Sequence, residues 1–207
     1  MTDHVWLCSI MNHGVVTGGM EDDLSQKDVE LAIQAQKLNN KGQPVPREMC
    51  PTRIWSGEHG LPFKNIVDLF PSGSHLIVSA RAADIMRQYD LGGGALYPVS
   101  EGVYQKDNKT RIPGGEFFTW IFGNTKTAFL EQHSPKAEAM GPGGRGWCDF
   151  ANAKDNDIAV SKAAERGPDV WVDPILFKSI FLSAALGNAL VAGGMKTSMR
   201  LLRCRVL

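Results

Sequence analysis

The side chains best suited to catalysis in this chain are its histidines and the acid and hydroxyl groups beside two of them. Glu58 precedes His59, and Ser134 follows His133. A hydrolase uses such groups as base, orienting acid and nucleophile when the fold brings them together. No Gly-x-Ser-x-Gly turn marks a nucleophilic serine, and adjacency in sequence does not establish hydrogen-bonding geometry. We therefore predict no catalytic residue, and keep as the alternative a hydrolase site built from Glu58, His59 and His133.

Residue spacing also argues against a metal site and a phosphate loop. No two histidines are four residues apart, and the four cysteines form no CxxC pair, so no zinc site is indicated. The segment 141–146 (GPGGRG) lacks the Lys-Ser/Thr pair of a phosphate-binding loop. The run Gly92–Gly94 follows a predicted helix, whereas a dinucleotide fingerprint opens one. We predict no metal and no cofactor.

Charge and hydropathy exclude several further classes of function. Lys+Arg and Asp+Glu both number 22, so the formal net charge is zero, and no basic surface for direct nucleic-acid binding is indicated. The opening residues do not have the pattern of a signal peptide. The apolar run 179–195 is shorter than the roughly 20 residues of a membrane span. We predict a cytoplasmic protein with no membrane segment, whose cysteines are free thiols.

Two segments of the chain share one pattern, and the elements that this pattern predicts must position the functional side chains. Residues 75–99 and 179–206 each contain an apolar run, a serine, an alanine-rich amphipathic stretch, a glycine stop and a second apolar run. This order predicts strand, N-cap, helix, C-cap and strand. Ser79 and Ser183 are accordingly predicted to be helix caps. Whether the two segments are a true duplication, and whether they pair in one sheet, stays open.

The rest of the chain gives shorter elements. We predict an opening strand over 4–11 and one helix from Ser25 through Leu38. Its narrow face, with Val29, Ala32, Ile33 and Gln36, is expected to pack at the edge of the core. A strand is expected at 53–55, irregular chain over 57–74, an antiparallel meander over 95–130, a long loop over 131–157 and a strand at 169–172. In the C-terminal strand, alternation places Leu202, Cys204 and Val206 on one face.

These elements predict an α+β fold in which a mixed, mainly antiparallel sheet packs against a few helices. A length of 207 residues suits one domain. We divide it into an N-terminal part (1–74), with one helix and irregular connectors, and a core (75–207).

The C-terminal part of the core resembles a known family. The run IFLSAALGNALVAGG, the following MRLLRCRVL and the preceding DVWVDP are similar to the C-terminal signature of a bacterial immunity-protein family, number 11 in the immunity nomenclature. That signature is a tryptophan-containing strand, a strand ending in serine, a helix and a final strand. HLIVSARAADIMRQYDLGGG resembles the family's central region, so the resemblance covers about residues 75–207.

The resemblance implies a cytoplasmic protein that binds and neutralises a cognate toxin of a polymorphic toxin system. The toxin would be encoded beside it and delivered by contact-dependent or type VI secretion. Such a protein needs no catalytic residue, and the family supplies no binding motif to transfer. A non-catalytic regulatory binding module is a further alternative, and a homodimer stays open.

If the chain binds a toxin, two loops are the predicted contacts. One is acidic, with Glu21, Asp22 and Asp23, and the other contains Arg145 and Trp147. Acidic groups steer the association of a basic partner, such as a nuclease. Tryptophan and arginine are common anchors of protein interfaces.

Overall fold

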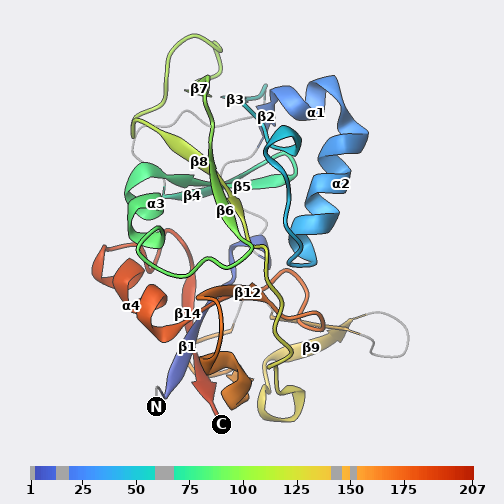
Figure 1. The fold of residues 1–207 in the computed structure, drawn as a ribbon, viewed down its shortest axis with the longest axis vertical. Helices are drawn as coiled ribbons and strands as arrows, with labels where there is room; N and C mark the ends of the chain where they lie inside the picture. Colours follow the sequence, from blue (N-terminus) through green and yellow to red (C-terminus); the bar gives the residue numbers. More distant parts are fainter. Residues whose placement is uncertain (1–2, 13–18, 59–67, 141–145, 150–152) are drawn as a thin grey trace.

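The computed structural model describes residues 3–12, 19–58, 68–140, 146–149 and 153–207 (Figure 1). Its fold is α+β, as predicted, and most of the strand pairs are antiparallel. The upper sheet in Figure 1 consists of β4 (Leu69–Ser72), β5 (His75–Ser79), β6 (Ala95–Pro98) and β8 (Phe117–Ile121), in the order β4-β5-β8-β6. The lower sheet consists of β1 (His4–Cys8), β11 (Ala159–Val160), β12 (Val170–Val172), β13 (Ile180–Leu182) and β14 (Leu201–Val206), in the order β11-β14-β1-β13-β12.

The two strand–helix–strand segments occupy the same place in their sheets. Helix α3 (Ala80–Met86) joins β5 to β6, and both strands pair antiparallel with β8, which lies between them. Helix α4 (Ala184–Ala192) joins β13 to β14, and both pair antiparallel with β1. An outer strand completes each side, since β4 pairs with β5 and β12 pairs with β13. The chain thus contains one four-stranded unit twice, and the segments pair in two sheets rather than one.

Equivalent residue pairs of the two units face the same hydrophobic cluster. Val78, the residue before the serine of the first unit, pairs with Phe118; Leu182, the residue before the serine of the second, pairs with Trp6. β1 therefore supplies to the second unit the strand that β8 supplies to the first, although β1 opens the chain. The division predicted at residue 75 does not coincide with either sheet, because β1 and β4 precede it.

Corresponding side chains of the two units meet in one hydrophobic core. Leu76 and Val78 of the first unit and Ile180 and Leu182 of the second are buried in the same cluster. Helices α3 and α4 also contact each other there and lie side by side (Figure 1). Full burial of each such side chain contributes about 1.5–3 kcal/mol. The two units therefore stabilise each other.

Both serines cap their helices, as predicted. Ser79 Oγ accepts a hydrogen bond from the backbone N–H of Ala82, and Ser183 Oγ accepts one from Leu186. Helix α4 ends as predicted at Gly193, with Gly194 at φ +80°. The prediction for Gly92–Gly94 is wrong. Helix α3 already ends at Met86, and the glycines form a turn that meets the end of β8.

The helix predicted from Ser25 is in fact two helices. They are α1 (Asp23–Lys27) and α2 (Val29–Asn40), separated by Asp28. Asp22 caps α1, and Asp28 caps α2 by accepting from the N–H of Leu31. A second acidic cap within the pattern starts a new helix there.

The prediction for the core-facing side of this segment is also wrong in part. Val29 and Ile33 are 59% and 42% exposed, whereas Ala32 and Ala35 are buried. Asn39 fixes the buried side, because its side chain donates to the carbonyl of Trp120 and accepts from the N–H of Phe122. A polar contact with the end of β8 thus sets the rotation of α2.

The meander predicted over 95–130 is interrupted. β6 and β8 pair with each other, but β7 (Gly102–Tyr104) leaves that sheet and pairs in parallel with β3 (Arg53–Ser56). β2 (Met20–Asp22) pairs on the other side of β3, which completes a small sheet of order β2-β3-β7. The predicted strand at 53–55 is therefore confirmed. Among the described residues, the segment 127–130 pairs with other strands through one isolated bridge, between Phe129 and Val160.

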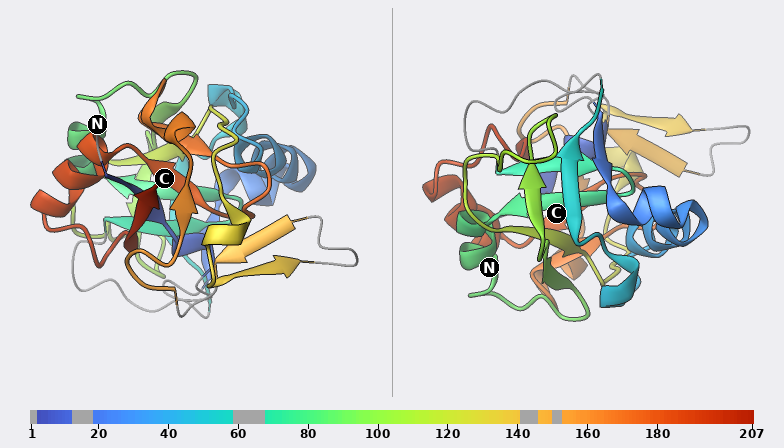
Figure 2. Two further views of the ribbon diagram at one scale, coloured as in Figure 1. Left: turned by 90° about the horizontal axis from the view of Figure 1, so that it is seen from below. Right: turned by 90° about the horizontal axis from the view of Figure 1, so that it is seen from above.

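Other connecting segments contain more regular structure than predicted. β4 lies within 57–74, and a hairpin of β9 (Ala137–Met140) and β10 (Gly146–Asp149) lies within 131–157. This hairpin projects from the body (Figure 2). The opening strand stops at Cys8, and short 3₁₀ helices are η1 (Ile10–Asn12), η2 (Arg47–Met49), η3 (Glu131–His133) and η4 (Lys162–Glu165).

The predictions for the strands near the C-terminus are confirmed. β12 falls within 169–172, and Leu202, Cys204 and Val206 of β14 contact one hydrophobic cluster on the outer side of the lower sheet. Within the described residues, no helix has both the length and the apolar character needed to cross a membrane.

The buried His75 gives the fold a predictable pH dependence. Its Nε2 lies 3.0 Å from the carbonyl oxygen of Met49, and its Nδ1 has no hydrogen-bond partner among the described residues. Burial lowers the pKa of His75 from 6.5 to about 4, against the opposing effect of that hydrogen bond. The unfolded chain therefore binds a proton that the folded chain excludes, and stability is lost as pH falls from 6.5 toward 4.

We expect this group to reduce the free energy of unfolding by about 2 kcal/mol between pH 7 and pH 5. The measurement is urea denaturation at both pH values, for the wild type and for His75→Gln, which keeps an N–H for the Met49 carbonyl. The variant should show a smaller loss. An equal loss in both proteins would assign the pH dependence to other groups.

Candidate partner-binding surface

The small sheet β2-β3-β7 presents a polar and aromatic face to its outer side. Along β3, Ile54 and Ser56 are buried, while Arg53 and Trp55 are partly exposed. This alternation places Arg53 and Trp55 on the outer face. Glu21 and Tyr104 stand opposite Trp55 in the neighbouring strands. We call this the outer face of the small sheet; it lies at the upper end of the molecule in Figure 1 and is seen from above in Figure 2.

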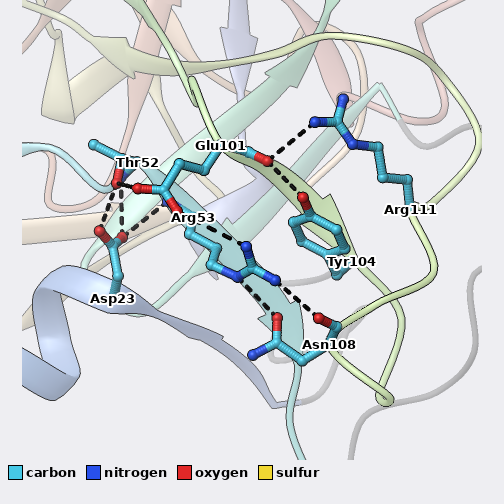
Figure 3. Close-up of polar contacts among 7 residues, drawn as sticks. All are labelled: Asp23, Thr52, Arg53, Glu101, Tyr104, Asn108 and Arg111. Atoms are coloured by element: carbon cyan, nitrogen blue, oxygen red, sulfur yellow. Dashed lines mark hydrogen bonds and ion pairs between the residues drawn. The ribbon is translucent and has the colours of Figure 1, made fainter.

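Two arginines lie against the ring of Tyr104 on this face. The guanidinium carbons of Arg53 and Arg111 are 4.1 and 5.7 Å from the ring centroid. Arg53 Nε donates to Asn108 Oδ1 at 3.0 Å, and its Nη2 donates to the carbonyl of Asn108 at 2.8 Å (Figure 3). The Tyr104 hydroxyl donates to the carbonyl of Glu101 at 2.7 Å. The stack is therefore ordered before any partner arrives, which reduces the entropy lost on binding.

The loop between Tyr104 and Arg111 is held in a fixed shape. Asp107 accepts hydrogen bonds from the Thr110 hydroxyl and from the backbone N–H groups of Thr110 and Lys109. These bonds lower the pKa of Asp107 to about 2, with the Thr110 hydroxyl making the largest contribution. Lys106 and Lys109 are exposed on this loop. The loop presents donor groups on a rigid backbone.

Of the predicted acidic contacts, Glu21 is exposed on the outer face of the small sheet. Its Oε2 accepts hydrogen bonds from Trp55 Nε1 at 3.2 Å and Gln26 Nε2 at 3.1 Å. Asp23 is only partly exposed, because Oδ1 accepts from the N–H groups of Thr52 and Arg53 and Oδ2 accepts from the Thr52 hydroxyl (Figure 3). Asp23 thus ties the start of α1 to the start of β3.

The prediction that Asp22 lies on an exposed acidic loop is wrong. Asp22 ends β2 and is fully buried. Burial raises its pKa, and the hydrogen bonds from Ser25 oppose this rise. It serves as the cap of α1, because its Oδ1 accepts a hydrogen bond from the backbone N–H of Ser25 at 2.7 Å.

The second predicted contact region is only partly described. Arg145 lies outside the described residues. Trp147 is partly exposed in β10 and packs against the outer cluster of the lower sheet, with its ring centroid 6.2 Å from that of Phe129. The backbone N–H of Trp147 donates a hydrogen bond to the carbonyl of Ile175. Trp147 therefore attaches the projecting hairpin to the body.

The residues of the alternative hydrolase site do not come together as far as they are described. Glu58 lies two residues after the end of β3, and its carbonyl accepts a hydrogen bond from Lys106. The carbonyl of His133 accepts from Arg205 on β14, in the lower half of the molecule (Figure 1). His59 lies outside the described residues. Within the described part of the chain, no three potential metal ligands cluster.

The stack of Arg53, Tyr104 and Arg111 was not predicted from the sequence. The only local signal was Arg53 and Trp55 on either side of an apolar residue, which is typical of a half-buried strand. Searches against protein-family models and against curated proteins give no match to the chain.

Proposed function

We propose that this chain is an immunity protein that binds and neutralises a cognate secreted toxin, acting by contact rather than by catalysis. The observation that carries the proposal is the order of elements at the C-terminal end. Trp171 lies in β12, β13 ends before Ser183, α4 follows, and β14 closes the segment. This is the order in the immunity-family signature that the sequence resembles.

The outer face of the small sheet supports the proposal from a second direction. Arginine, tyrosine and tryptophan are the residue types that dominate binding energy at protein interfaces. Here Arg53 and Trp55 lie partly exposed on one sheet face, Tyr104 is buried against two arginines, and hydrogen bonds already fix these side chains. Such a face suits a rigid inhibitor that docks on another protein.

Co-purification of this chain with the product of the adjacent gene tests the proposal. We expect a tagged copy of this chain, co-expressed with that product, to retain it in a stoichiometric complex through size-exclusion chromatography. Recovery of this chain alone, with the neighbouring product folded and soluble in the same cells, would contradict the proposal.

A further inference from the structure

We propose that the toxin docks on the outer face of the small sheet and presents a carboxylate-rich segment to Lys109 and Arg111. This inference rests on the proposed function and adds to it the chemistry of the partner. It differs from the sequence-based prediction, in which acidic residues of this chain meet a basic toxin.

Several carboxylates near this face already accept hydrogen bonds from other groups of the chain. Both oxygens of Asp23 accept hydrogen bonds within the chain, and so do both oxygens of Asp107. Glu21 already accepts two hydrogen bonds at one oxygen. The Thr52 hydroxyl has one proton and lies closer to Asp23 than to Glu101, and Glu101 lies 3.8 Å from Arg53 Nη1. Asp23 and Asp107 are therefore engaged within the chain, whereas Glu21 and Glu101, which lie on the Arg53 side of the face, keep exposed carboxylate oxygens.

The cationic side chains of Arg111 and Lys109, in contrast, have few partners among the described residues. Arg111 donates only one weak hydrogen bond, from Nη2 to the carbonyl of Glu101 at 3.3 Å, among the contacts of the described residues. The guanidinium has five N–H donors, so most remain available. The Lys109 ammonium has no hydrogen-bond or ion-pair partner among the described residues, and both side chains are exposed. The hydrogen-bonding capacity that is open at Lys109 and Arg111 is therefore donor capacity.

A carboxylate-rich segment of a partner matches these donor groups. A guanidinium whose N–H groups are available binds a carboxylate through two parallel hydrogen bonds, and a nearby ammonium adds a point charge. The ring of Tyr104 lies against the Arg111 guanidinium, and Trp55 pairs with Tyr104 on its other side and offers partly exposed apolar area there. An acidic segment with adjacent apolar residues fits this arrangement. Since the loop is fixed by Asp107, little order has to be created on binding.

Association kinetics with the purified product of the adjacent gene test the inference. The test protein carries Lys109→Glu and Arg111→Glu. The matched control carries Lys162→Glu and Arg166→Glu, two exposed residues in and beside η4 that give the same change in net charge. Far-UV circular dichroism and thermal unfolding establish that both proteins are folded.

We expect the test protein to associate about tenfold more slowly than wild type at low salt, with the difference shrinking as salt is raised. The control should associate at the wild-type rate. Equal rates for the test protein and the control would overturn the inference and leave the proposed function standing. If wild type itself fails to bind the neighbouring product, the proposed function falls and this inference falls with it.

Zero-length carbodiimide cross-linking gives a second, direct readout on the wild-type complex. The reagent joins an amine to a carboxylate with which it forms an ion pair. We expect mass spectrometry to find Lys109 or Lys106 joined to an aspartate or glutamate of the partner. Cross-links from Lys162 in place of these residues would place the interface elsewhere.

Discussion

Replacing Gly123 with alanine should lower the free energy of unfolding by about 4 kcal/mol. Gly123 has φ +67°, and a Cβ added there would lie well under 3.0 Å from the carbonyl carbon and oxygen of Gly93 and from the nitrogen of Gly94. These are backbone atoms, so no side chain can rotate away to relieve the contact. The neighbouring Asn124 bonds both units, because its side chain donates to the carbonyls of Leu91 and Val170. Overpacking at Gly123 therefore strains the junction between the two units.

Gly115→Ala is the matched control for the backbone contribution. Gly115 also has a positive φ, +76°, but no described atom lies within 4 Å of the position that a Cβ would take there. We expect a loss of only about 1 kcal/mol, from the left-handed conformation alone. Equilibrium urea denaturation measures both variants. Equal losses at the two positions would show that the close approach of Gly93 and Gly123 does not limit stability.

Replacing Asp68 with alanine should cost about 3 kcal/mol. The carboxylate is 3% exposed and pairs with Arg81. It also accepts hydrogen bonds from Ser79 Oγ at 3.0 Å and Ser198 Oγ at 2.9 Å. Ser198 lies between α4 and β14, so Asp68 joins the first unit to the second. Its loss leaves the buried Ser79 hydroxyl without this acceptor and Arg81 without its anion.

The pH dependence of this effect has a definite sign. Burial raises the pKa of Asp68, but hydrogen bonds from Arg81, Ser198 and Ser79, with the Arg81 charge, outweigh it and leave the pKa below 3.8. The stability contributed by the carboxylate is therefore present above pH 3.8 and is lost as pH falls through the folded-state pKa. The gap between wild type and Asp68→Ala should close in that acidic range.

Asp84→Ala provides the comparison for Asp68. Asp84 is 68% exposed and pairs only with Arg87, the residue that caps the end of α3, at 2.9 Å, among the described ion pairs. Such a pair contributes about 0.5 kcal/mol or less. Urea denaturation at pH 7 distinguishes the two positions, and similar losses would contradict the role given to Asp68 at the junction.

Local signals in the sequence predicted the elements that local contacts determine. Ser79 and Ser183 each stand between an apolar run and an alanine-rich helix, and each caps that helix through an N–H three residues on. Where two caps lie close together the prediction failed: one helix was expected from Ser25, but Asp28 caps a separate helix. The α+β class followed from these local patterns.

Long-range pairing could not be read from the sequence in the same way. β1 inserts between β13 and β14 from the opposite end of the chain, and β7 pairs with β3 in parallel. No turn sets either register. That parallel pairing brings Arg53 of β3 against Tyr104 of β7 and so creates the stack with Arg111. The sequence therefore did not predict the candidate surface. Glu21 was predicted as part of an acidic loop that would meet a basic partner, and the same reasoning misplaced the buried Asp22.

The growth of bacteria that express the product of the adjacent gene is the most direct test of neutralisation. With this chain co-expressed, we expect growth at the rate of cells that lack that product. Without it, or with Lys109→Glu and Arg111→Glu at limiting expression, growth should slow or stop. A neighbouring product that is harmless, or one that stops growth equally with and without this chain, would contradict the proposed function.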